Sequence, residues 1–293
     1  MTCGTCAAAL RWAESWLEEV DAIATMLGRP VASSWESQQP SGWTRRSDSP
    51  TTSENVMLKL ILGLHVAAGT TALVSMWIPM FARKGASVHR KAGKVFVAAM
   101  AAVSITALVL AGARFLFDPR PQARQAGLFL LFVSVLTASA VSTGVRVLKA
   151  KQRTGPRLHW WDVGLAGLLA AASVAAAIYG IVAGATLFAP FAVIGLITGG
   201  GQLAYWLRSP RSPMHWWFEH MSSMLAACIA ATTAFLVVNA QRFGADTFSF
   251  IVWLMPTVVG VPVIAIWTAY YRRRFDVSKA RGARLEAEGS IQP

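Results

Sequence analysis

The chain of 293 residues is 55% hydrophobic and only 14% charged, and its formal net charge is +13. A soluble domain is excluded, because its helices would carry a polar face, whereas the long apolar segments of this chain do not. The basic residues lie mostly between these segments, which indicates a membrane topology and excludes nucleic acid as the partner.

Residues 1–56 form a polar segment that is rich in acidic side chains. Within it, six apolar residues recur at helical spacing and predict one amphipathic helix: Leu10, Ala13, Leu17, Val20, Ala24 and Leu27. Two interpretations stay open. Either this helix docks or dimerises, and dimerisation would make the protein a homo-oligomer, or Met57 is the true start and residues 1–56 are a start-site artefact.

Seven apolar segments follow, and each is long enough to cross the ~30 Å hydrocarbon core of a bilayer as a helix. Their predicted bounds are 60–81, 95–117, 126–148, 163–184, 187–207, 216–240 and 248–271. The sequence therefore predicts an all-α, polytopic membrane helix bundle over residues 57–274. Residues 275–293 are predicted to be a basic, disordered tail.

The basic residues predict which helix ends face the cytoplasm. The loops after the first and third segments, the loop before the sixth and the C-terminal tail contain 18 of the 27 Lys and Arg residues, against four on the opposite side. Tryptophan and tyrosine gather at the same helix ends. The positive-inside rule then predicts a multi-pass protein of the cytoplasmic membrane, with its N-terminus outside, its C-terminus inside and anionic lipid at the inner face.

The histidines are the candidates for a chemical site. Four of them lie where a segment enters the membrane from the predicted inner face: His89, His159, His215 and His220. Because imidazole binds both haem iron and transition metals, two of these side chains could ligate a b-type haem or a metal ion, with Glu219 or Asp162 as an added metal ligand. The alternative is that they hydrogen-bond to loop carbonyls or lipid phosphates.

His65 differs from the other four because it lies inside the first segment, near the outer side. At ~1.5 Å per residue, it is separated from His220 by about 20 Å in depth, too far to share one haem. A redox, haem-binding or metal-binding membrane protein is the first functional hypothesis. The alternative is a transporter or permease for a small solute, with a path lined by His65 and the segment that contains Pro256 and Pro262. No sequence motif decides whether the protein is an enzyme.

Several short motifs resemble an uncharacterised family of bacterial predicted multispan membrane proteins, over about residues 60–274. The motifs are His65 with Gly69, His89-Arg90 with Gly93, His220-Met221, and Trp253-Leu254-Met255-Pro256-Thr257. The resemblance implies a multispan inner-membrane protein. It brings no established activity, cofactor or catalytic residue.

Overall fold

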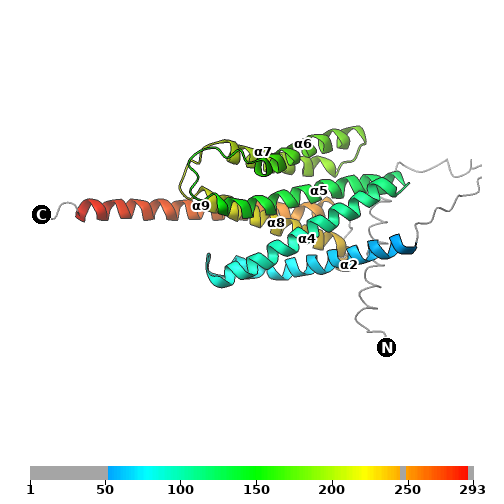
Figure 1. Cartoon of the computed structure of the whole chain (residues 1–293), viewed down its shortest axis with the longest axis horizontal. Coiled ribbons are helices and arrows are strands. Elements are labelled where there is room, and N and C mark those ends of the chain that lie inside the picture. Colours follow the sequence, from blue (N-terminus) through cyan, green and yellow to red (C-terminus); the bar gives the residue numbers. More distant parts are fainter. Residues whose placement is uncertain (1–51, 245–248, 290–293) are drawn as a thin grey trace, which may run out of the picture.

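The computed structural model describes residues 52–244 and 249–289, and the regular structure in these residues is entirely helical (Figure 1). The helices are α2 (Thr52–Ser75), α3 (Trp77–Phe81), α4 (Ser87–Phe117), α5 (Pro121–Arg146), η1 (Val147–Lys149), α6 (Trp160–Val182), α7 (Phe188–Leu207), α8 (His215–Asn239), η2 (Gln241–Phe243) and α9 (Phe250–Gly289). Seven stretches of the described chain are long and apolar enough to span a membrane, as predicted, with α2 and α3 together forming the first.

Several helices extend beyond the apolar segments predicted from the sequence. α4 begins at Ser87 rather than at residue 95, so Arg90, Lys91 and Lys94 lie in its first turns. A helix satisfies its own backbone hydrogen bonds, and long basic side chains can reach the headgroup layer, so charge ends the apolar segment without ending the helix.

The two ends of the described chain also differ from the predicted boundaries. α2 begins at Thr52, so the last residues of the polar segment belong to the first helix. α9 continues to Gly289, so this helix extends through residues 275–289, since extending an existing helix avoids the cost of nucleating a new one. The predicted amphipathic helix between Leu10 and Leu27 lies outside the described residues.

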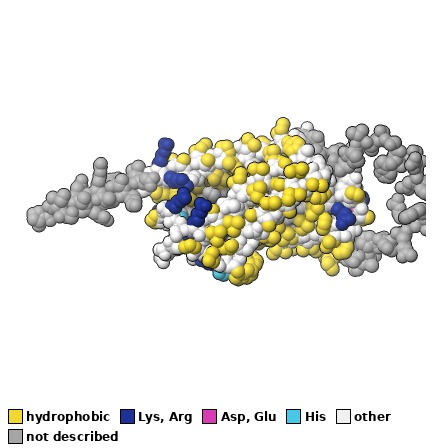
Figure 2. Space-filling model, turned by 90° about the horizontal axis from the view of Figure 1, so that it is seen from above, with side chains coloured by type: hydrophobic (Ala, Val, Ile, Leu, Met, Phe, Trp, Pro, Cys, Tyr) yellow, Lys and Arg dark blue, Asp and Glu magenta, His cyan; other side chains and the backbone are white. Residues whose placement is uncertain are grey.

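α5 is the central helix of the bundle. It packs against α4, α6, α7 and α8, and Figure 1 shows the α6–α7 pair and the α2–α4 pair on opposite sides of it. Half of the apolar membrane-spanning stretch of α5 is buried inside the protein, whereas only 11% of the corresponding stretch of α9 is buried. Many large apolar side chains are exposed on the outside of the bundle. Figure 2 shows apolar side chains over the middle of the visible surface, with Lys and Arg gathered towards its ends. This distribution suits a protein surrounded by lipid.

Small residues allow the helices to approach closely. A Cβ atom on Gly199 would lie 2.9 Å from the backbone nitrogen of Ala170, so a larger residue at this position would force α6 and α7 apart. A second close approach joins α5 to α8, where a Cβ on Gly144 would overlap the side chain of Met224. No local sequence motif marks Gly144 as a contact between helices. This contact brings α8 close to α5, where His220 bonds to the Gly144 carbonyl.

Aromatic side chains fill the core far from the basic loops. Phe129 of α5 packs edge-to-face against Phe188, Phe191 and Trp253, with ring centroids 5.3, 5.1 and 5.3 Å apart. All four side chains are buried. Edge-to-face aromatic pairs stabilise a fold beyond the effect of the apolar area that they bury, so this cluster holds α5, α7 and α9 together. The polar clusters lie at the other end of the bundle.

Candidate functional site

The end of the bundle where α4, α6 and α8 begin is called here the basic end. All four candidate histidines lie there: His89 is the third residue of α4, His159 is the N-cap of α6, and His215 and His220 lie in the first two turns of α8. Their hydrogen-bond partners divide them into three separate environments.

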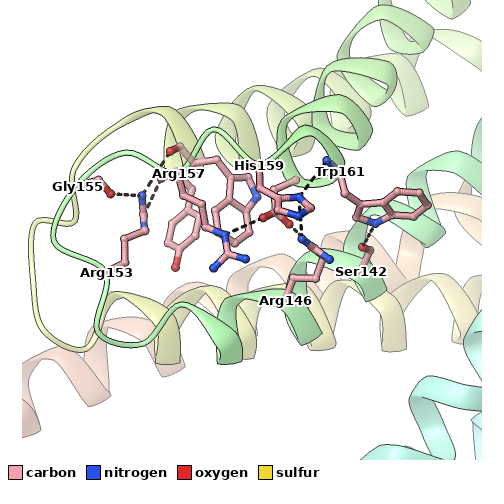
Figure 3. A network of polar contacts seen from close by, with 10 residues as sticks. Ser142, Arg146, Arg153, Gly155, Arg157, His159 and Trp161 are labelled. Carbon is pink, nitrogen blue, oxygen red and sulfur yellow. Dashed lines mark hydrogen bonds and ion pairs between the residues drawn. The ribbon is translucent and has the colours of Figure 1, made fainter.

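His159 belongs to a network that joins α5 to α6 (Figure 3). Its Nδ1 accepts a hydrogen bond from the backbone N–H of Trp161 at 3.2 Å and lies 3.1 Å from Nη2 of Arg146. An acceptor at this position satisfies one of the unpaired N–H groups at the start of α6. His159 therefore has a capping role in the structure.

Asp162 is the centre of the same network, and its side chain is fully buried. Nε of Arg146 pairs with Oδ1, and Nε of Arg157 pairs with Oδ2 at 3.0 Å. Asp162 also lies in the first turn of α6, where the helix dipole favours a negative charge. Both carboxylate oxygens are engaged by guanidinium groups, so the surroundings of Asp162 are those of a buried ion cluster. This set, Arg146, Arg157 and Asp162, is called the arginine cluster below.

Arg153 closes the C-terminal end of α7. Its Nη2 donates to the carbonyl of Tyr205 at 2.8 Å and its Nη1 donates to that of Arg208 at 2.9 Å, while the guanidinium lies 4.5 Å from the Tyr205 ring. It supplies donors to carbonyls that have no partner within the helix. The candidate residues chosen from the sequence do not include Arg153, because a cation that caps a distant helix leaves no local spacing signal.

His215 and Glu219 face α7 and the loop before α6. Nδ1 of His215 is 2.8 Å from the hydroxyl oxygen of Tyr205. Glu219 lies close enough to Arg153 and Tyr205 to interact with them electrostatically. Consecutive residues of a helix point about 100° apart, so Glu219 and the adjacent His220 serve different neighbours.

His89 and His220 form the third environment, called the histidine pair. Nδ1 of His89 lies 3.1 Å from the carbonyl oxygen of Pro79, and Nδ1 of His220 lies 2.6 Å from that of Gly144. A carbonyl can only accept, so each Nδ1 carries a proton, and in the neutral form of each imidazole Nε2 has a free lone pair. The two side chains are close enough that a positive charge on one imidazole would act on the other.

Two lysines accompany the histidine pair. Lys84 and Lys151 are both close enough to act electrostatically on His220. Nζ of Lys84 donates to the carbonyl of Pro79 at 2.9 Å, the same oxygen that His89 uses, and Nζ of Lys151 lies 4.4 Å from the Trp216 ring. The environment of the pair is therefore cationic.

The predicted addition of Glu219 or Asp162 to two of the histidines is not realised. Within residues 52–244 and 249–289, no group of three or more His, Cys, Asp or Glu side chains is placed to hold a metal ion. The reason is local: Asp162 is held by two arginines, and Glu219 interacts electrostatically with Arg153 and Tyr205.

His65 bridges two helices inside the bundle. Its Nδ1 lies 2.9 Å from Oγ1 of Thr106 on α4, and that hydroxyl donates to the carbonyl of Ala102 at 2.7 Å. Thr70 and Thr71 donate to carbonyls of their own helix. The hydroxyl groups of Thr70 and Thr71 are therefore hydrogen-bonded within α2, whereas the contact between His65 and Thr106 joins α2 to α4.

No family model matches this chain, and comparison with curated proteins and with solved structures finds no match. The resemblance to an uncharacterised family of multispan membrane proteins therefore stays a prediction.

Proposed function

We propose that this multi-pass protein binds a b-type haem, which the imidazoles of His89 and His220 would hold. The observation that carries the proposal is the pair of Nδ1–H bonds to the carbonyls of Pro79 and Gly144. Histidines that bind a metal usually donate their second ring nitrogen in this way, because the bond fixes the tautomer and makes the free nitrogen more basic.

The composition of the site favours haem over a bare metal ion. A porphyrin supplies four nitrogens itself and needs only two axial ligands from the protein, whereas a bare ion needs further side chains. Lys84 and Lys151 would repel a free divalent cation, but they match the two carboxylates that a haem carries on one edge.

The depth of the two ligands agrees with this assignment. His89 is in the first turn of α4 and His220 is in the second turn of α8, and both helices start at the basic end. His220 also bonds to Gly144, which is two residues from the end of α5. The two imidazoles therefore lie within about two helical turns of the same end, which is consistent with their holding one haem together.

The absorption spectrum of the purified protein tests the proposal. Protein prepared from haem-replete membranes should show a haem band that shifts on reduction with dithionite. His89→Ala and His220→Ala should each abolish the band. His159→Ala is the matched control, because it removes an imidazole from the same end and should leave the band unchanged.

Two results would contradict the proposal. One is a folded wild-type preparation that stays colourless after haem is supplied. The other is a band that persists unaltered in His220→Ala. Elemental analysis of the same colourless sample would then decide whether a bare metal ion occupies the site.

The basic end is assigned to the cytoplasm as part of the same proposal, in the cytoplasmic membrane. The assignment is supported by the concentration of Lys and Arg in the loops and tail at this end. A reporter that is active only in the cytoplasm should be active when fused after Arg284 and silent when fused after Thr186. The opposite pattern would place the basic end outside.

A further inference from the structure

We infer that the surface at the start of α6 binds the phosphate of an anionic phospholipid. This surface, called the lipid site, consists of Arg146, Arg157, Leu158, Trp160 and Trp161. It is separate from the histidine pair, and the inference does not depend on haem.

The charge of the arginine cluster provides the first argument. Two guanidinium groups share the one carboxylate of Asp162, so one positive charge is uncompensated. Each arginine faces Asp162 with its Nε, and Figure 3 shows the terminal nitrogens of Arg157 pointing away from that carboxylate. The side chains of Arg146 and Arg157 are 22% and 30% exposed, so part of each side chain reaches the surface.

The phosphate group suits this pair of donors. A guanidinium offers its N–H groups as a planar fork that matches two oxygens of one phosphate, and charge-assisted bonds of this kind are among the strongest in proteins. A net positive charge also selects among lipids. A phosphatidylglycerol headgroup carries a net negative charge, whereas phosphatidylcholine carries none, so the first is expected to be preferred.

The apolar neighbours provide the second argument. Trp160 is 72% exposed, and Leu158 and Trp161 beside it are exposed as well. The membrane-spanning stretch of α6 starts at Trp160, so these rings would lie at headgroup depth, where indoles are favoured. Trp161 is fixed there by a bond of 3.2 Å from its Nε1 to Oγ of Ser142 on α5. A cation with apolar side chains around it fits a lipid better than a free phosphate ion.

Native mass spectrometry of the detergent-purified protein tests the inference. Titration with phosphatidylglycerol should show saturable binding, and Arg157→Gln should weaken the apparent affinity by about tenfold or more, since a charge-assisted bidentate contact is lost. The substitution leaves Asp162 paired with Arg146, so the fold should survive. Lys91→Gln, which removes one positive charge at the same end, is the matched control and should leave the affinity unchanged.

Three further arms keep the test decisive. Phosphatidylcholine with the same acyl chains and glycerol phosphate without acyl chains should both bind weakly to the wild type. Trp160→Ala should also weaken phosphatidylglycerol binding, and because this side chain is largely exposed its loss should not unfold the protein. The inference is overturned if Arg157→Gln and Lys91→Gln weaken binding equally, or if the neutral and anionic lipids bind equally well.

Discussion

Two polar clusters lie at the same end of the bundle, and they use their charges in opposite ways. In the arginine cluster, a buried carboxylate has both oxygens engaged by guanidinium groups. In the histidine pair, each imidazole donates a hydrogen bond from Nδ1 to a backbone carbonyl, and the charged side chains near His220 are lysines. The first cluster therefore places an anion between two cations, whereas the second places cations around two imidazoles.

The difference shows why a polar residue type alone does not identify a site. His159 and His220 are both histidines near the start of a helix at the basic end, yet Nδ1 of His159 accepts hydrogen bonds whereas Nδ1 of His220 donates one. An imidazole that caps a helix uses its lone pair within the protein. An imidazole that donates to a carbonyl keeps a lone pair for a ligand. Substitutions in the two clusters should therefore have different consequences.

The largest loss of stability is expected from Asp162→Asn. The substitution keeps the shape of the side chain but removes the only anion between Arg146 and Arg157, which leaves two partly buried guanidinium groups unpaired. Breaking a buried pair in this way costs about 3 kcal/mol. Thermal unfolding of the detergent-purified variant should show a clearly lowered midpoint.

A matched variant controls for disturbance of the same helix junction. Ser142→Ala removes only the acceptor of the Trp161 indole, an exposed contact that should contribute no more than about 1 kcal/mol. Equal stability of Asp162→Asn and the wild type would show that the arginine cluster does not stabilise the fold.

A smaller loss is expected from His220→Ala in haem-free protein. The variant loses one hydrogen bond to the Gly144 carbonyl and part of a side chain at the α5–α8 contact, which together cost about 1–2 kcal/mol. The same thermal measurement, made beside Asp162→Asn, compares the two clusters directly. If His220→Ala is the less stable of the two, the histidine pair is chiefly a structural contact and the contrast between the clusters fails.

Much of the fold follows from the sequence because the bilayer sets a length requirement. Each of the seven apolar segments predicts a spanning helix, and the described chain contains seven such helices. The ends of α4 and α9 do not follow in the same way. Hydropathy changes at the first charged residue, whereas the helix ends where its backbone hydrogen bonds end, and the two positions differ.

The candidate site follows from the sequence only in part. The four histidines can be placed at one end because each lies where a helix starts, but their grouping depends on which helices meet. His220 bonds to Gly144 because α5 is central and approaches α8 closely at that glycine, a long-range contact without a local motif. The position of Glu219 near Arg153 and Tyr205 likewise depends on how α8 sits in the bundle.

The smallest effect is expected at the opposite end of the bundle, where Asp118 forms an ion pair near the surface. Arg120 contacts this carboxylate with Nε at 3.0 Å and Nη2 at 2.8 Å. The hydrogen bond from Arg120 lowers the pKa of Asp118 below its ordinary value. A lowered carboxyl pKa contributes stability above the pKa of the unfolded chain, and this contribution is lost as the pH falls through the folded value.

Asp118→Asn should therefore lower the unfolding midpoint only slightly at neutral pH, in keeping with about 0.5 kcal/mol for an exposed pair. The difference from the wild type should begin to shrink as the pH falls below about 4, the usual range of an aspartate, and should vanish at more acidic pH. Added salt should reduce it at neutral pH, because charges that reach solvent are screened. Two results would contradict this comparison: a loss of stability as large as that of Asp162→Asn, or a loss that does not depend on pH. Either would show that burial does not explain why Asp162 contributes more to stability than Asp118.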